Sequence, residues 1–78
     1  MLSEQVRMLV ARELKLSVDQ VGDRAGSDTI ERWDSMAHIN ICLAVQSEFG
    51  IEMSIDEIAE SASIPALVAL IQKRGRPT

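Results

Sequence analysis

Apolar residues recur at three- and four-residue intervals in four stretches of the chain, a spacing typical of amphipathic helices. In the first stretch the residues that share one face are Val6, Leu9, Val10 and Leu14. Ser3 precedes them and is a residue type that caps helix starts. The whole pattern predicts helices at about residues 3–16, 34–49, 55–61 and 64–74. It therefore predicts an all-α fold, a small four-helix bundle with a short third helix.

A long loop separates the first two predicted helices. Residues 17–33 contain glycine and serine breaks and charges of both signs. Loops of this length inside compact domains are usually functional or packed by their own apolar residues. We expect Val18, Val21 and Ile30 to anchor this one to the core.

Capping residues mark the ends of the other predicted helices. Asp34 is a strong N-cap for the second helix, and Gly50 is suited to a left-handed C-terminal cap. The segment Ser54-Ile55-Asp56-Glu57 has the pattern of a capping box at the start of the third helix. The fourth is expected to open at Ser63, with Pro65 in its first turn.

The second predicted helix is apolar around most of its circumference. Its wide apolar arc consists of Ile39, Cys42, Leu43, Val45 and Phe49, and Ala37, Ile41 and Ala44 extend it. Such a helix lies centrally in a bundle or presents apolar surface to a partner. Cys42 is expected to be a small buried residue, and His38 an exposed one.

The composition limits what the chain does. Seventy-eight residues form one domain, 1–78, whose thin core argues against an enclosed catalytic pocket and hence against an enzyme. Since Trp33 and Phe49 are the only aromatic residues, the core is expected to be aliphatic. One cysteine and one histidine are too few for a disulfide or a zinc site. No apolar run approaches the ~20 residues of a membrane span, and no signal peptide is evident, so we expect a cytoplasmic protein.

The net charge is −4, which disfavours nucleic acid as a partner because such proteins need a basic face. Residues 33–72 hold six acids and no lysine or arginine. This acidic region either steers basic partners or is a solvated face. Asp19, Asp23 and Asp28 suggest a calcium-binding module, but their spacing does not match an EF-hand loop, so no metal site is expected.

The segment Trp33-Asp34-Ser35-Met36 carries the candidate chemistry. With Asp34 as the N-cap, the Ser35 hydroxyl lies near the positive end of the helix, where a phosphate ester is stabilised. Ordinary capping is the competing interpretation. A self-activated serine nucleophile is rejected, because His38 lies beside Ser35 on the same helix and the chain has no G-x-S-x-G elbow.

Several segments together resemble the acyl carrier protein family. They are Leu14-x-Leu16-x-x-Asp19-Gln20-Val21, Asp34-Ser35-Met36, Glu48-Phe49-Gly50-Ile51 and Asp56-Glu57-Ile58. The resemblance runs from about Val6 to Ile71 and implies that Ser35 carries 4′-phosphopantetheine. A separate phosphopantetheinyl transferase would install this arm from coenzyme A. Its thiol would hold an acyl or aminoacyl group as a thioester, supplied by a loading ligase and used by downstream acyl-transferring enzymes.

The resemblance also implies that residues around the arm contact partner enzymes. The residues at these positions are Met36, Ile39, Asn40, Leu43, Met53 and Glu57. The carrier itself is expected to be a monomer. For Leu43, packing in the core is the competing interpretation. Met36 replaces the family's usual leucine, as it often does in D-alanyl carrier proteins. The second helix has a single acid, Glu48, which favours a specialised pathway over fatty-acid synthesis. The alternative is an unmodified helical protein–protein interaction domain in which Ser35 is only a cap.

Overall fold

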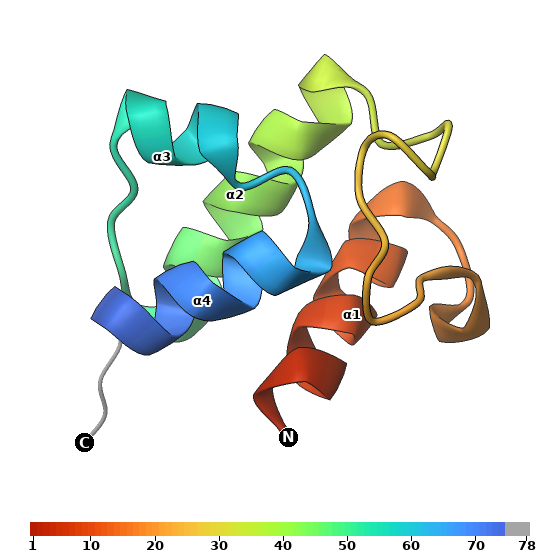
Figure 1. The fold of residues 1–78 in the computed structure, drawn as a ribbon, viewed down its shortest axis with the longest axis horizontal. Coiled ribbons are helices and arrows are strands. Elements are labelled where there is room, and N and C mark those ends of the chain that lie inside the picture. Colours follow the sequence, from red (N-terminus) through yellow and green to blue (C-terminus); the bar gives the residue numbers. More distant parts are fainter. Residues whose placement is uncertain (75–78) are drawn as a thin grey trace.

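A computed structural model describes residues 1–74 of the chain. The sequence also predicts a frayed tail from Arg74 to Thr78, of which residues 75–78 lie outside the described residues. The elements are α1 (Leu2–Leu14), a 3₁₀ turn η1 (Val18–Gln20), α2 (Ser35–Phe49), α3 (Ile55–Glu60) and α4 (Ile64–Arg74). Figure 1 shows them in a compact arrangement with the long loop at one side of α1. The predicted all-α fold with a long first loop and a short third helix is confirmed.

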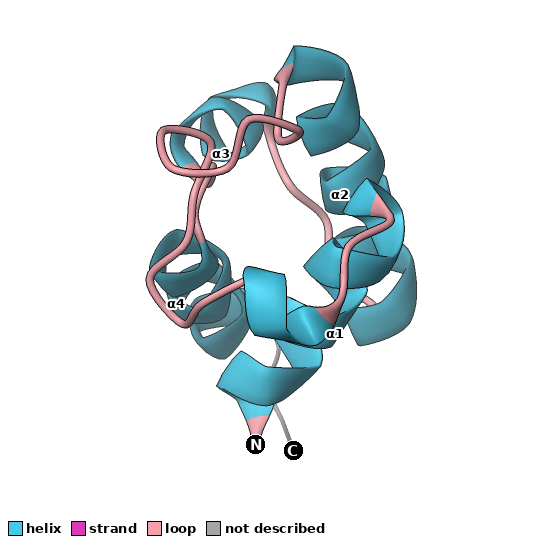
Figure 2. Cartoon of the chain, turned by 90° about the vertical axis from the view of Figure 1, so that its right-hand side faces the viewer, coloured by secondary structure: helices cyan, strands magenta, loops and turns pink. Residues whose placement is uncertain are grey.

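Helix α1 is the shared packing partner of the other two long helices. It packs against both α2 and α4, and Figure 2 shows these two helices on opposite sides of it. The helix begins after Met1, so the predicted cap at Ser3 is wrong. It also ends two residues earlier than predicted, because Lys15 adopts a left-handed conformation (φ 59°). The Leu16 amide then donates to the Ala11 carbonyl (2.9 Å), which closes the helix end.

The buried core draws on α1, α2, α4 and the loops between helices. Its largest fully buried side chains are Trp33, Ile41, Ile64, Leu67, Val6, Val10, Val21, Val45 and Cys42. The expectation of a purely aliphatic core is wrong, because Trp33 is only 1% exposed. A tryptophan supplies more buried area than any aliphatic residue, which helps a domain with little core.

The long loop is fixed by apolar anchors and by two arginines. Val21 is fully buried, and Val18 and Ile30 pack against the core as predicted. Arg7 donates to the Val21 carbonyl (2.7 Å). Arg32 donates to the carbonyls of Leu14 (3.2 Å) and Lys15 (3.0 Å), which the end of α1 leaves without helical partners.

The loop is also bonded to the connection between α3 and α4. Ser27 N–H donates to the Ala62 carbonyl (3.0 Å), and Ile64 N–H donates to the Ala25 carbonyl (2.8 Å). Gly26 lies between these bonds, where an added Cβ would come 2.8 Å from the Ala62 carbonyl oxygen. Glycine at this position thus permits the close approach that holds the end of the loop.

Helix α2 buries only part of the predicted apolar arc: Cys42 and Val45 are buried as expected, but Ile39 and Leu43 are not. The buried residues are His38, Ile41, Cys42 and Val45. Ile39 and Leu43, which the sequence placed on the buried arc, are 54% and 59% exposed. The difference arises because α2 is apolar nearly all round, so its sequence does not distinguish the face that α1 covers.

The last two helices are held in different ways. Helix α4 buries Ile64, Leu67, Leu70 and Ile71. The Ser63 hydroxyl accepts the Ala66 N–H (3.2 Å), so the predicted start of α4 is confirmed. Helix α3 has the predicted capping box between Ser54 and Glu57, but none of its own side chains is fully buried. Apolar packing therefore contributes much more to α4 than to α3.

Candidate functional site

Ser35 is the first residue of α2, and its side chain is exposed. The preceding residue, Asp34, is the N-cap, with its Oδ1 accepting the Ala37 N–H (2.9 Å). Because first-turn amides have no carbonyl partner within the helix, the N–H groups of Ser35 and Met36 remain available to a ligand. The hydroxyl thus lies beside free amides at the positive end of a helix of 15 residues.

Two open hollows flank this helix start. One, of about 300 Å³, is lined by Ser27, Trp33, Asp34, Ser35, His38 and Ala62. The other, of about 330 Å³, is lined by Glu13, Leu14, Arg32, Asp34, Met36, Ala37 and Asn40. A group attached to Ser35 therefore has space on either side of α2. The long loop and the α3–α4 connection border one side, and the end of α1 borders the other.

His38 does not occupy the position expected from the sequence. It is only 9% exposed, so the prediction of an exposed residue is wrong. Its Nδ1 lies 3.0 Å from the Trp33 Nε1, and its Nε2 lies 2.6 Å from the Ile58 carbonyl oxygen. Both ring nitrogens are therefore engaged away from Ser35. The sequence offered no signal for this, because the partners come from the loop and from α3.

Cys42 lies in the interior of α2, one turn after His38. Burial raises the pKa of its thiol to about 11, so the group stays protonated at neutral pH. A buried, protonated thiol is a poor nucleophile. Cys42 is a packing residue, as the sequence indicated.

The side chains predicted to contact partners do not all share one surface. Met36 is 75% exposed, and together with Ile39 and Leu43 it forms an exposed apolar stripe along α2, beside the exposed Asn40. Met53 is buried, so we correct its assignment: this side chain belongs to the core and is not accessible to a partner. The exposure of Leu43 likewise removes its interpretation as a core residue.

Glu57 is held by contacts within the chain. Its carboxylate accepts the Ser54 N–H (2.9 Å) and pairs with Arg74. The Ser54 backbone N–H and the Arg74 guanidinium lower the pKa of the Glu57 carboxyl. Ile55, at the start of α3, was not singled out by the sequence analysis but is 85% exposed. Its exposure could not be read from sequence, because its apolar character equally suits a buried position.

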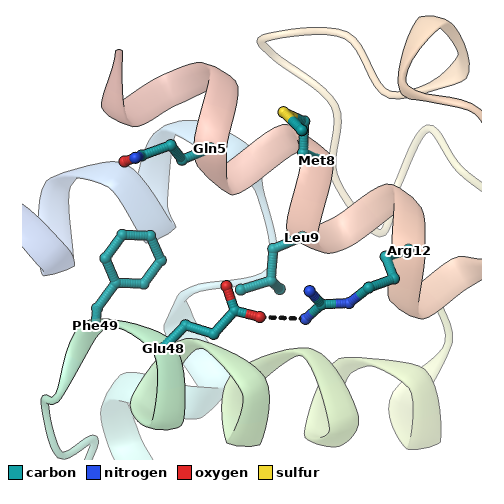
Figure 3. A pocket seen from close by; sticks show the side chains of 6 residues that line it. All are labelled: Gln5, Met8, Leu9, Arg12, Glu48 and Phe49. Carbon is teal, nitrogen blue, oxygen red and sulfur yellow. Dashed lines mark hydrogen bonds and ion pairs between the residues drawn. The ribbon is translucent and has the colours of Figure 1, made fainter.

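The opposite end of α2 holds a third hollow, of about 350 Å³. It is lined by Gln5, Met8, Leu9, Arg12, Glu48 and Phe49. Figure 3 shows the ion pair of Arg12 and Glu48 bridging α1 and α2 at this hollow. The one acid of α2 is therefore neutralised by α1 and lies away from Ser35.

Neither a metal site nor a membrane span is found in residues 1–74. No group of three or more His, Cys, Asp or Glu side chains in this range is arranged to hold a metal ion. No helix within the described part of the chain has the length and apolar character needed to cross a membrane.

Comparison with known families completes the description of the site. Residues 4–71 match the family described as "Phosphopantetheine attachment site", a range that includes all of α2 and most of α1 and α4. No curated protein matches the chain significantly. Members of this family are carriers that interact with modifying and acyl-handling enzymes. The family's cofactor is 4′-phosphopantetheine, bound covalently to a serine. Because the match covers most of its length, the chain belongs to the phosphopantetheine-binding, acyl-carrier-protein family.

Proposed function

We propose that Ser35 is the attachment serine and that this domain is a non-catalytic carrier of acyl or aminoacyl groups. The observation that carries the proposal is the exposed Ser35 hydroxyl at the first position of α2, within the range that matches the family. In residues 1–74 this hydroxyl has no hydrogen-bond partner within the chain. By contrast, Ser54 and Ser63 cap helices, and Ser61 is buried and bonded to the Glu57 carbonyl.

The surroundings of Ser35 fit the phosphate of the arm. The Ser35 and Met36 amides and the helix dipole stabilise negative charge at this point. The Asp34 carboxylate is already used by the Ala37 N–H, so it caps the helix and leaves the two preceding amides free. When bound, the arm supplies a terminal thiol on which cargo is held as a thioester.

Within residues 1–74, no histidine is available as a base that could activate Ser35. His38 is the only histidine, and both of its ring nitrogens are bonded elsewhere. A phosphopantetheinyl transferase is therefore expected to supply the base when it attaches the arm. Loading and transfer of cargo would likewise depend on a ligase and on acyl-transferring enzymes.

We further propose that these enzymes dock on the apolar stripe formed by Met36, Ile39 and Leu43, with the carrier acting as a monomer. The stripe starts beside Ser35 and carries no acid, because Glu48 is paired with Arg12 at the other end of α2. A docking surface of this kind favours partners with apolar recognition surfaces. It supports a carrier of a specialised biosynthetic pathway over one of fatty-acid synthesis.

Intact mass spectrometry tests the attachment. Incubation with coenzyme A and a broad-specificity phosphopantetheinyl transferase should add the mass of one phosphopantetheinyl group. The gain should disappear in Ser35→Ala and persist in Ser27→Ala, a matched control because Ser27 is exposed and lines the same hollow. A folded wild type that gains no mass would favour an unmodified interaction domain, and a gain that survives Ser35→Ala would move the site elsewhere.

The docking surface is tested by the rate of the same reaction. Met36→Glu should slow modification by about tenfold, the effect of losing one strong interface residue. Met8→Glu is the control, because Met8 is an exposed methionine beside the hollow at the other end of α2. Equal rates for the two variants would exclude Met36 from the transferase contact.

A further inference from the structure

Helix α3 is tied to its neighbours by the partly buried Ile58 side chain, which packs against the core, and by polar contacts. It has no fully buried side chain and makes only sparse backbone contacts with the other helices in the described part of the chain. Arg74 of α4 pairs with Glu57, and the Gln46 side chain of α2 accepts the Met53 N–H (3.1 Å) just before α3. A further, partly buried hydrogen bond runs from His38 of α2 to the Ile58 carbonyl (2.6 Å).

The contacts of His38 fix the position of its proton. An indole N–H only donates hydrogen bonds, so the Nδ1 that faces Trp33 must be the acceptor. The single proton of the neutral ring is then on Nε2, which donates to the Ile58 carbonyl. One ring in one tautomer therefore joins the end of the long loop, α2 and α3.

We propose that Trp33, His38 and the Ile58 carbonyl form a pH-sensitive latch: neutral His38 holds α3 against α2 beside Ser35, and protonation of its Nδ1 releases α3. Protonation would place a second N–H against the Trp33 N–H, so this bond is lost and two donors face each other. It would also create a charge at a buried position, which is unfavourable without an anionic partner. The ring gains hydration only by turning toward solvent, which carries Nε2 away from Ile58.

The groups around the ring do not supply such a partner. Cys42, on the same helix, lies 3.5 Å from Nε2, and burial raises the pKa of its thiol, so it remains neutral. Asp34 shares the hollow with His38, but its carboxylate is exposed and bonds to the Ala37 N–H, not to the ring. On α3, Glu57 is engaged by the Ser54 N–H and by Arg74. From the loop and the α3–α4 connection, the residues lining the hollow beside His38 are the uncharged Ser27, Trp33 and Ala62.

Release of α3 would expose apolar interior next to the attachment serine. His38, Trp33 and Ser35 line one hollow. Movement of α3 away from His38 would therefore enlarge the hollow that lies beside Ser35. The latch would then control whether cargo on the arm enters the interior between α2 and α3. This consequence, unlike the latch itself, rests on the proposed function.

Solution NMR of the unmodified 78-residue protein tests the latch. The ¹⁵N shifts of His38 at pH 7 should report the Nε2–H tautomer. Between pH 7 and pH 5.5, protection of the Ile58 and Ser61 amides, corrected for intrinsic exchange, should fall by at least ~3-fold. Protection of amides in the middle of α1 should stay unchanged. An Nδ1–H tautomer, or α3 protection that does not change over this range, overturns the proposal.

His38→Gln is the matched variant. A glutamine oxygen accepts from the Trp33 indole and its NH₂ donates to the Ile58 carbonyl, but the amide does not titrate. In this variant the protection of α3 should be independent of pH between 7 and 5.5. The same acid-induced loss in His38→Gln would show that another group opens α3. Because these measurements need no arm, they stand apart from the intact-mass test of Ser35.

Discussion

The two ends of α2 carry hollows of similar size, about 300 and 350 Å³, yet the polar groups at the two hollows differ. At the first residues an exposed serine lies beside free amides, and exposed apolar side chains follow it. At the last residues the Arg12–Glu48 pair spans the hollow, and Gly50 closes the helix in a left-handed conformation (φ 65°). The size of a hollow thus does not distinguish a functional end. Under the proposed function, the distinguishing feature is the pair of unsatisfied helix amides next to the Ser35 hydroxyl.

The largest difference between the two ends should appear in the free energy of unfolding when the aromatic residue at each end is replaced by alanine. Trp33→Ala removes a fully buried indole and should lower the free energy of unfolding by about 3–5 kcal/mol. Phe49→Ala, at the other end, should cost less than half as much, because Phe49 is only partly buried. Urea unfolding followed by circular dichroism measures both, and equal losses would contradict the asymmetry.

The interior below the Ser35 end should respond to alkaline pH. Because the pKa of folded Cys42 is about 11 and its ordinary value is 9.0, the unfolded chain loses this proton first. The protonated Cys42 thiol therefore contributes its full stabilisation of the folded state below pH 9. As the pH rises from 9 toward 11, the free energy of unfolding should fall by about 2–3 kcal/mol. Urea titrations at several pH values should show this decline in the wild type but not in Cys42→Ala. Parallel profiles would contradict the assignment to Cys42.

The cap at the Ser35 end should have a moderate effect. Asp34→Ala leaves the Ala37 N–H without its acceptor and should lower the free energy of unfolding by about 1 kcal/mol. Asp34→Asn keeps an oxygen at this position and should retain most of the stability. If thermal unfolding finds Asn as unfavourable as Ala, the carboxylate acts through its charge and not through the cap bond.

The smallest effect is expected from the ion pair at the other end. Arg12 and Glu48 are both largely exposed, so water and salt screen their attraction. A double-mutant cycle with Arg12→Ala and Glu48→Ala should give a small coupling at low salt that disappears at high salt. A large, salt-independent coupling would show instead that this end of α2 is held as firmly as the Trp33 end.

The sequence by itself determined the features that depend on a few neighbouring residues. Asp34, Ser54 and Gly50 cap helices where the pattern predicted, because a cap bond joins residues at most four positions apart. The apolar spacing of residues 64–74 was equally sufficient, since only one face of α4 is continuous enough to bury. The assignment of Ser35 as the attachment site also came from this local pattern, and it remains a proposal.

Only the tertiary structure decided which face of α2 is buried, and that His38 and Met53 are interior. Helix α2 is apolar nearly all round, so its own residues do not determine which face α1 covers. His38 became buried because Trp33 and the Ile58 carbonyl satisfy both of its ring nitrogens. These partners come from separate elements of the chain. A buried polar group is stable only when such partners are in place, so its burial follows from packing and not from its own position in the sequence.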